Sequence, residues 1–277
     1  MDNNHLVFDF QSSTPCSTKV VEEMAPYWNE LWGNPSNNNN RSGVFASAAV
    51  EVSREKIASY LNINPKRLIF TSGATEANNL GLVGHARAKA QQVGKPGHII
   101  TVSTEHHAVL DPLRQLQKEG FSLSELKPNK DGLINIEKLS EAVEKDTFLV
   151  SVMTANNEIG VLQPISEIGS FCKRKGIAFH TDAAQALGYL DLEPDKFRID
   201  FCCAGNGYQR SGSPLLIAHA GSLIGIWQFP GSVLGLRRCC VSLGYLSQPA
   251  IPYRGFLTSN RPARQSPRWS PSIAAKC

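Results

Sequence analysis

Between residues 68 and 203 the chain alternates short apolar runs with longer segments whose apolar residues recur at helical spacing. The short runs predict strands at residues 68–71, 98–102, 121–126, 147–152, 177–181 and 199–203. The longer segments predict helices at residues 75–93, 108–119, 136–144 and 165–175. Because parallel strands are joined by helical crossovers, this order predicts an α/β fold, with a mostly parallel sheet and helices on both faces.

Two helices are expected before the sheet begins. Residues 19–32 carry apolar side chains at helical spacing, and Pro26 is expected to kink this helix because proline lacks a backbone donor. Residues 44–61 predict an amphipathic helix with Val50, Ile57, Ala58 and Leu61 on one side.

The composition of the chain changes after Cys203. Residues 204–277 are rich in Gly, Pro, Ser and Arg and contain no clear helix with a polar face. All 24 acidic residues lie at or before Asp200, whereas seven Arg and one Lys follow it, so the net charge of +4 conceals a basic end. We therefore expect an amino-terminal arm at residues 1–16, a large α/β domain at 17–203, and an aberrant, basic and disordered tail at 204–277.

The basic tail does not indicate a nucleic-acid or membrane partner, because it lacks interleaved aromatic residues and a basic amphipathic helix. Residues 215–236 are uncharged and long enough to span a bilayer. They contain His219, Gln228, Pro230 and four glycines, which argues against a transmembrane helix.

Cysteine usage indicates a reducing compartment. The chain has seven cysteines, an odd number, and no secretory start, so a cytoplasmic protein is expected. Cys202-Cys203 and Cys239-Cys240 are adjacent pairs without the spacing that zinc ligands need, and we predict no metal site.

The turn from the first predicted strand into its helix carries Ser72, Gly73 and Thr75. Backbone N–H groups at a helix start, with the positive end of the helix dipole, suit a phosphate. The alternative is an ordinary N-cap by Ser72 or Thr75.

Polar residues also follow the next strands, where open α/β sheets bind their ligands. His106 can stack on a flat ring or transfer protons, or it is simply a solvated loop histidine. The amides of Asn156 and Asn157 can donate to a phenolate or carboxylate, or they form a turn before Gly160.

Asp182 stands at the carboxyl end of the predicted buried strand at 177–181 and is followed by the small-residue turn Ala183-Ala184-Gln185. A carboxylate in this position can pair with the protonated ring nitrogen of pyridoxal phosphate, or it can cap a following helix. A phosphate site, an imidazole, an amide pair and this acid, gathered at one edge of the sheet, together describe a pyridoxal phosphate pocket.

Four segments carry a more specific pattern: Ser72-Gly-Ala-Thr-Glu-Ala-Asn-Asn79, Thr104-Glu-His-His-Ala-Val-Leu-Asp111, Ala155-Asn-Asn-Glu-Ile-Gly160 and His180-Thr-Asp-Ala-Ala-Gln185. They resemble the cysteine desulfurases, pyridoxal phosphate enzymes of the class V aminotransferase group. The resemblance runs from about Asp9 to Asp200. It implies the large domain of a pyridoxal phosphate-dependent transferase, incomplete on its carboxyl-terminal side.

The resemblance also implies roles for individual residues. In this family the positions of Ala74 and Thr75 hold the cofactor phosphate, and that of His106 stacks on the pyridine ring and assists proton transfer. The position of Asn157 lies near the cofactor oxygen and the substrate carboxylate. The remaining two, Asp182 and Gln185, match the partners of the ring nitrogen and the ring oxygen.

The implied activity removes sulfur from L-cysteine, leaving alanine and a persulfide on an enzyme cysteine, and it supplies iron–sulfur cluster assembly. Family members are homodimers, so a homodimer is expected. Selenocysteine lyase or another class V enzyme is an alternative within the same group. A non-enzymatic pseudogene product, or a dimer partner of an intact homologue, is an alternative outside it.

The sequence departs from the family after Asp200. Residues 200–209 contain neither the histidine nor the Schiff-base lysine that the family has there, and the only lysine beyond Lys196 is Lys276. No cysteine stands in the context of the family's catalytic cysteine. We expect noncovalent pyridoxal phosphate binding at best and little or no activity. We also expect that residues from about 204 onward arise from a change of reading frame.

Overall fold

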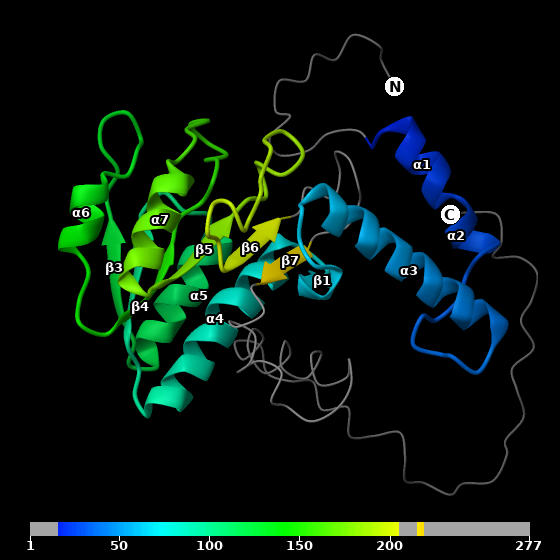
Figure 1. The fold of residues 1–277 in the computed structure, drawn as a ribbon, viewed down its shortest axis with the longest axis horizontal. Helices are drawn as coiled ribbons and strands as arrows, with labels where there is room; N and C mark the ends of the chain where they lie inside the picture. Colours follow the sequence, from blue (N-terminus) through cyan, green and yellow to red (C-terminus); the bar gives the residue numbers. More distant parts are fainter. Residues whose placement is uncertain (1–15, 205–214, 219–277) are drawn as a thin grey trace, which may run out of the picture. The chain divides into compact units, whose positions relative to one another are not determined.

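In the computed structural model, residues 16–204 and 215–218 are described. They contain a seven-stranded sheet (Figure 1). From one edge to the other its strands are β1 (Leu68–Phe70), β7 (Leu215–Ala218), β6 (Phe201–Ala204), β5 (Ala178–Asp182), β4 (Thr147–Ser151), β2 (His98–Val102) and β3 (Ser122–Leu126). The neighbouring strands from β6 to β3 pair in parallel, and β7 is antiparallel to both β6 and β1. The predicted mostly parallel α/β sheet is confirmed.

The helices before the sheet are α1 (Thr18–Met24), α2 (Pro26–Asn29) and α3 (Arg41–Tyr60), followed by the short 3₁₀ helix η1 (Pro65–Arg67). The expected kink at Pro26 is a full break between α1 and α2. Helix α3 begins three residues before the predicted start at 44, because the side chain of Asn40 accepts a hydrogen bond from the backbone N–H of Gly43 at 2.7 Å and caps the helix.

The crossover helices are α4 (Ala74–Val93), α5 (His107–Lys118), α6 (Ile136–Glu141) and α7 (Ile165–Lys175), close to their predicted bounds. Helix α4 ends at Gly94 and α7 at Gly176, both in the left-handed conformation that favours glycine after a helix. Helix α6 is shorter than predicted, since its last turn gives way to the loop that leads into β4.

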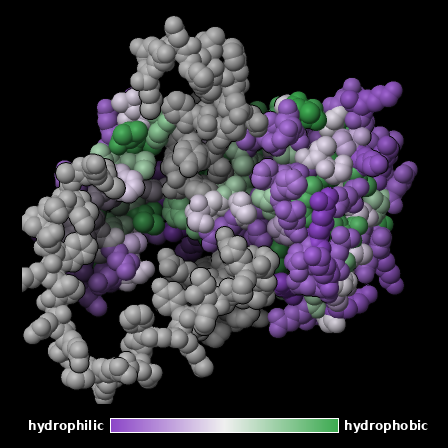
Figure 2. Space-filling view, turned by 180° about the vertical axis from the view of Figure 1, so that it is seen from behind, coloured by the Kyte–Doolittle hydropathy of each residue, from purple (hydrophilic) through white to green (hydrophobic). Residues whose placement is uncertain are grey.

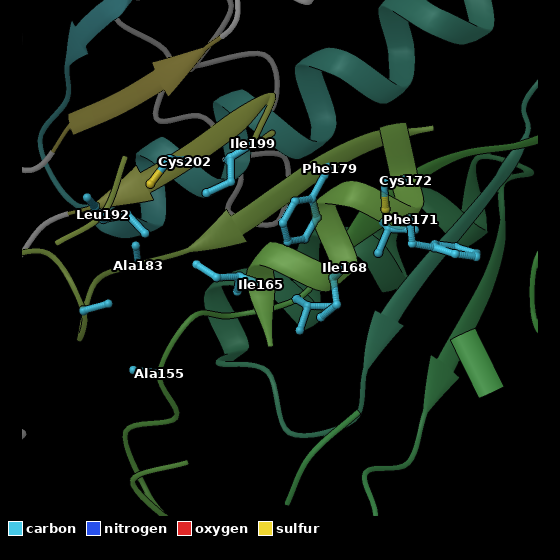
Figure 3. Close-up of a cluster of buried hydrophobic side chains, with 14 of the residues drawn as sticks. Ala155, Ile165, Ile168, Phe171, Cys172, Phe179, Ala183, Leu192, Ile199 and Cys202 are labelled. Atoms are coloured by element: carbon cyan, nitrogen blue, oxygen red, sulfur yellow. The ribbon is translucent and has the colours of Figure 1, made fainter. Parts of the chain in front are cut away.

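The sheet is covered on both faces, and alternate residues of its strands pack to opposite sides. On β5, Phe179 packs with Ile168 and Phe171 of α7, as Figure 3 shows. Ala178 faces the other way and packs against the cluster that includes residues of α4 and α5. Both faces of β5 are therefore removed from water, and its polar residues His180, Thr181 and Asp182 are buried with its apolar ones.

Helix α7 approaches the segment after β5 closely at Gly169. A Cβ atom at this position would lie 2.0 Å from the backbone oxygen of Phe197 and 3.3 Å from the Phe179 ring. Only glycine allows this contact, which brings residues 193–199 against α7 and fixes the direction in which the chain enters β6.

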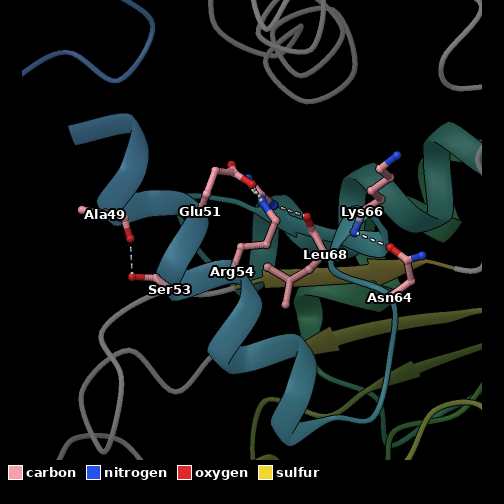
Figure 4. A network of polar contacts seen from close by, with 7 residues as sticks. All are labelled: Ala49, Glu51, Ser53, Arg54, Asn64, Lys66 and Leu68. Atoms are coloured by element: carbon pink, nitrogen blue, oxygen red, sulfur yellow. Dashed lines mark hydrogen bonds and ion pairs between the residues drawn. The ribbon is translucent and has the colours of Figure 1, made fainter. Parts of the chain in front are cut away.

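Arg54 attaches α3 to the edge of the sheet (Figure 4). Its Nη1 donates to the backbone oxygen of Leu68 in β1, and its guanidinium lies 4.9 Å from the centre of the Phe70 ring. Nε of the same side chain is held 3.1 Å from the Glu51 carboxylate.

The predicted apolar face of α3 is only partly buried. Ala58 and Leu61 are fully buried in the core, whereas Val50 and Ile57 are partly exposed. Other apolar side chains of α3, Val44, Phe45 and Val52, each expose about half of their surface. Within the described residues, α3 joins the core cluster near its carboxyl end, through Ile57, Ala58 and the following Leu61.

The sequence analysis did not predict β7. Leu215-Leu-Ile-Ala218 lies within the segment expected to be disordered, yet these four residues pair with β6 on one side and β1 on the other. The expectation is therefore wrong for residues 215–218. A four-residue apolar run shows no periodicity of its own, but it can supply the partners that β1 and β6 need. The rest of the tail, at 205–214 and 219–277, and the arm at 1–15 lie outside the described residues.

The surface that Figure 2 shows over the α/β part of the chain is mostly hydrophilic, with small hydrophobic areas. This agrees with crossover helices that turn one apolar side to the sheet and a polar side to water. Within residues 16–204 and 215–218, no helix has the length and apolar character needed to cross a membrane.

Glu105 connects two loops at the carboxyl ends of the strands. It lies in the turn between β2 and α5, exposes 6% of its surface, and accepts a hydrogen bond at Oε1 from the backbone N–H of Met153 at 2.6 Å. Its Oε2 has no hydrogen-bond partner within the described part of the chain. Burial raises the pKa of this carboxyl well above its usual range, and the charge of Asp182 raises it further.

Replacing Glu105 with glutamine should therefore stabilise the protein increasingly as the pH rises. An acid whose pKa is raised on folding stabilises the folded protein below its unfolded pKa, about 4.3, and this contribution is lost as the pH rises through the folded pKa. Glu105→Gln keeps the Oε1 acceptor and does not titrate. We expect its advantage in unfolding free energy to grow by up to about 1.4 kcal/mol per pH unit above pH 5, measured by urea unfolding.

The exposed Glu141 provides the matched control, since Glu141→Gln makes the same chemical change at the end of α6. Its difference from the unsubstituted chain should not vary with pH in this way. A pH-independent difference for Glu105→Gln would show that the buried carboxyl does not retain its proton.

Candidate cofactor-binding site

The polar segments singled out in the sequence follow β1, β2, β4 and β5. The last three of these strands are parallel, so the loops that follow them lie at the same edge of the sheet. Asp182 is the last residue of β5, one position further into the strand than predicted, and pairs in register with Cys203 of β6. The strand order places Asp182 in the middle of this edge, between β4 and β6.

Asp182 exposes 5% of its surface, and each of its carboxylate oxygens accepts a hydrogen bond. Oδ1 accepts from the backbone N–H of Ala184 at 2.9 Å, and Oδ2 accepts from the Nδ2 amide of Asn78 at 2.7 Å. The residues after β5 form turns and no helix. The helix-cap alternative for Asp182 is therefore wrong, because the backbone donor it binds belongs to a turn.

The pKa of Asp182 is raised overall, because burial is the largest effect on it. The N–H of Ala184, the amide of Asn78 and the electrostatic interaction with His106 act in the opposite direction and lower this pKa. Glu105, the other buried carboxyl at this edge, has a single donor. The ionised form is thus better stabilised at Asp182, and Glu105 is the group that retains a proton.

Helix α4 begins after Gly73, its N-cap, and no side chain of the described residues caps it. The alternative of an N-cap by Ser72 or Thr75 is therefore wrong. A Cβ atom at Gly73 would meet no atom within 4 Å, so the space in front of the helix is open. Ala74 and Thr75 are the first residues of the helix, where its backbone N–H groups point outward.

His106 is the N-cap of α5 and is exposed. Its Nδ1 accepts a hydrogen bond from the backbone N–H of Ala108 at 3.0 Å. This bond orients the ring and places a proton of the neutral imidazole on Nε2. The ring also lies near enough to Asp182 to lower the pKa of its carboxyl.

The structure separates the roles of the two asparagines. Asn156 is 6% exposed and forms the turn, since its Oδ1 accepts from the N–H groups of Glu158 and Ile159, at 2.9 and 3.0 Å. Its Nδ2 donates to the backbone oxygen of Thr104 at 2.9 Å. Asn157 is only partly buried, and its amide donates to the Glu158 side chain at 3.3 Å.

Gln185 is partly buried and lies in the turn that follows Asp182. Of the predicted residues, the structure thus brings Asp182 and His106 into electrostatic contact and places Gln185 three residues from Asp182. The start of α4, with Ala74 and Thr75, is tied to Asp182 through Asn78 of the same helix.

The sequence analysis assigned no role to Asn78 or Glu105, although both lie in the quoted motifs. Asn78 could have been identified as the polar residue among Ala77, Gly81 and Leu82 on the apolar side of its helix. Glu105 shows no comparable pattern, because its partner Met153 lies 48 positions away.

A third buried polar group lies beneath this edge. Nδ1 of His180 contacts Ser151 Oγ at 2.8 Å, and its Nε2 contacts Cys203 Sγ at 3.2 Å. Burial lowers the pKa of His180 to about 3, and burial raises the pKa of Cys203 well above its usual range. Both side chains are therefore neutral near pH 7 and serve to join β4, β5 and β6.

The arrangement suits a flat, phosphorylated, cationic ligand. An uncapped helix start can receive a phosphate, and a buried carboxylate with lone pairs remaining on both oxygens can accept a bond from a protonated ring nitrogen. Pyridoxal phosphate has both groups. Among the residues described, no three His, Cys, Asp or Glu side chains are grouped so that they could hold a metal ion.

Comparison with known proteins agrees with these features. The family model described as aminotransferase class-V matches residues 6–206. The cysteine desulfurase IscS of Dechloromonas aromatica is 44% identical over 209 residues, which are 75% of this chain and 51% of that protein. The mitosomal cysteine desulfurase of Trachipleistophora hominis is 44% identical over 195 residues, which are 70% of this chain and 44% of that protein. The chain spans about half the length of these relatives.

Solved structures give the same result. The structure of SspA in complex with cysteine has a TM-score of 0.73 and 36% identity, over 77% of this chain and 61% of that one. A NifS-like protein has a TM-score of 0.73 and 32% identity, over 78% of this chain and 59% of that one. With a family model matching most of its residues and the fold and site described above, the chain belongs to the class V aminotransferase family.

Proposed function

We propose that this chain binds pyridoxal phosphate at the edge formed by α4, α5 and the end of β5, as a noncovalent ligand. The observation that carries this proposal is the buried Asp182 carboxylate, which accepts hydrogen bonds from two donors of its own chain and interacts electrostatically with His106. A buried carboxylate whose ionised form is stabilised by hydrogen bonds suits a cationic partner, and a protonated pyridine nitrogen is one.

The start of α4 is the proposed phosphate site. The N–H groups of Ala74 and Thr75 and the positive end of the helix dipole would bind the phosphate, and the open space in front of Gly73 admits it. Bound in this way, pyridoxal phosphate supplies an electron sink for reactions at the α-carbon of an amino acid.

Three further residues complete the proposed site. His106 would stack on the ring, with the proton-bearing Nε2 free of the bond that holds Nδ1. Asn157 would donate to the cofactor oxygen and the substrate carboxylate, because Asn156 is already committed to its turn. Gln185, in the turn beside Asp182, would donate to the ring oxygen.

The proposed substrate class is L-cysteine. Its support is the identity of 44% to proteins named cysteine desulfurase and the resemblance in fold to SspA, which was solved in complex with cysteine. In such a reaction the C–S bond of cysteine breaks, the sulfur passes to an acceptor thiol as a persulfide, and alanine remains. We propose that this sulfur would supply iron–sulfur cluster assembly, as the resemblance to cysteine desulfurases implies, in a reducing compartment such as the cytoplasm.

We further propose that the chain as it stands has little or no desulfurase activity. Its sequence contains no lysine between Lys196 and Lys276, where a covalent link to the cofactor is expected. Without a lysine amine the cofactor is not held covalently. The match to the family ends at residue 206, which supports a change of reading frame near residue 204.

Cofactor binding can be tested with pyridoxamine 5′-phosphate, which has no aldehyde to react with surface lysines. The chain should bind it measurably by isothermal titration calorimetry. Asp182→Asn should weaken the binding about tenfold or more, because a hydrogen bond to a charged group contributes about 1.5–3 kcal/mol. Asp191→Asn, at an exposed position, is the matched control and should bind like the unsubstituted chain. Equal affinity for the Asp182 variant would contradict the proposed ring-nitrogen contact.

The proposed inactivity is tested by sulfide release. With pyridoxal phosphate, a reducing thiol and L-cysteine, the chain should release sulfide no faster than the same solution without protein. L-Selenocysteine, tested in parallel, should give no selenide above its own control. If the chain releases sulfide or selenide clearly faster than these controls, and His106→Ala abolishes this release, the site works without the missing lysine.

A homodimer is also proposed, on the basis of the exposed apolar side chains of α1, α2, α3 and the loop after α2. Large apolar side chains this exposed are uncommon in monomers and mark interaction surfaces. Their exposed fractions range from 40% to 78%: Val21, Met24, Tyr27, Trp28, Leu31, Trp32, Phe45 and Val52.

Replacing Trp28 and Phe45 with serine should shift the protein to monomers. Burying one large apolar side chain contributes about 1.5–3 kcal/mol, and a two-fold interface counts each change twice, so the dissociation constant should rise at least about a hundredfold. Sedimentation equilibrium over a dilution series measures this. Val93→Ser, which removes an equally exposed side chain at the end of α4, should leave the dimer intact. A monomer in the unsubstituted chain contradicts the proposal.

A further inference from the structure

Asn78 is fully buried on α4, although its neighbours on that side of the helix are Ala77, Gly81 and Leu82. Its Nδ2 donates to Oδ2 of Asp182 at 2.7 Å, across 104 positions of sequence. Its Oδ1 has no hydrogen-bond partner among the described residues. Asn78 therefore has one strong contact, and this contact is with the candidate ring-nitrogen partner.

Core packing alone does not account for an asparagine here. A buried carbonyl oxygen without a partner is unfavourable, and a leucine of similar size would bury no polar group. The feature that an apolar side chain lacks is the donor to Asp182. The contact with Asp182 is therefore the physical reason for an amide at position 78.

The amide of Asn78 favours the ionised form of Asp182. An amide N–H donates to the carboxylate and does not give up its proton to it. Asn78 holds Oδ2 from α4 and Ala184 holds Oδ1 from the turn after β5, which fixes the plane of the carboxylate. Each oxygen keeps a lone pair for one more donor.

The position of Asn78 along α4 adds a second consequence. The proposed phosphate site, at Ala74 and Thr75, lies on the same helix about one turn earlier. One rigid element thus carries both the donors for a phosphate and the side chain that orients the Asp182 carboxylate. The separation between the phosphate site and the carboxylate depends on this helix.

We propose that Asn78 is a positioning residue, which orients the Asp182 carboxylate toward a protonated ring nitrogen at a set distance from the phosphate site on α4. This rests on the proposed binding of pyridoxal phosphate. Asn78 acts through Asp182 and does not itself touch the ligand. Other titratable groups that act on Asp182 or are affected by its charge are those of Glu105, His106, Cys202 and Cys203.

The binding test compares two ligands in the unsubstituted chain and in Asn78→Leu. The ligands are pyridoxamine 5′-phosphate and its carba analogue, in which a C–H group replaces the ring nitrogen. Asn78→Leu keeps the size of the side chain and removes the donor. It should lower the affinity for the first ligand about tenfold or more and change the affinity for the carba analogue less than about twofold.

An equal loss for both ligands would mean that Asn78 acts only by supporting the fold, and the proposal would be overturned. Gln91→Leu, at an exposed position of the same helix, is the matched control and should change neither affinity. Urea unfolding of every variant shows whether the compared proteins are folded.

A second measurement needs no ligand. The pKa of Asp182 is followed by NMR of the ¹³C-labelled carboxyl group, assigned by its loss in Asp182→Asn. Asn78→Leu should raise this pKa by about one unit or more, since it removes a donor to the charged form. An unchanged pKa would overturn the proposal. If the unsubstituted chain does not bind pyridoxamine 5′-phosphate, the proposed function fails, while the pKa shift still decides whether Asn78 controls Asp182.

Discussion

Burial of the Asp182 carboxylate at the end of β5 is a cost in free energy that the surrounding chain has to offset. The parallel strands on either side and the helices on both faces exclude water from this residue. Compensation comes from Asn78, from the N–H of Ala184 and from the electrostatic interaction with His106, each on a different segment. The first turns of α4, the start of α5 and the turn after β5 are thus positioned around one charge.

The sheet and its crossover helices could be predicted because each depends on local pattern. β5 begins within the short apolar run Ile177-Ala-Phe179, and α7 ends at Gly176, which the helix needs for its left-handed cap. β7 could not be predicted in this way. Its four residues become a strand through pairing with β6 and with β1, and β1 lies far away in sequence. The local sequence pattern contains no sign of this pairing.

The candidate site, like the fold, could be predicted only in part from the sequence. Residue types at the ends of strands identified Asp182, His106 and the start of α4 as candidates, because α/β topology brings strand ends to one edge. The contacts that set their chemistry are tertiary. Asn78 meets Asp182 across 104 positions and Glu105 meets Met153 across 48, so neither role is visible in the sequence. The sequence also does not show which of the two asparagines forms the turn. The structure shows that it is Asn156, because its Oδ1 accepts hydrogen bonds from two backbone N–H groups.

The proposed pocket does not depend on the missing lysine for its shape. Asp182 is oriented by donors of its own chain, His106 by the N–H of Ala108, and α4 by packing of its apolar side on the sheet. A covalent link would instead raise the residence time of the cofactor and set up its reaction with an amino acid. In the function proposed for this chain, binding and reaction are therefore separable. The residues proposed to recognise the phosphate and the ring nitrogen are held by contacts within residues 73–184, and none of these contacts involves a Schiff-base lysine.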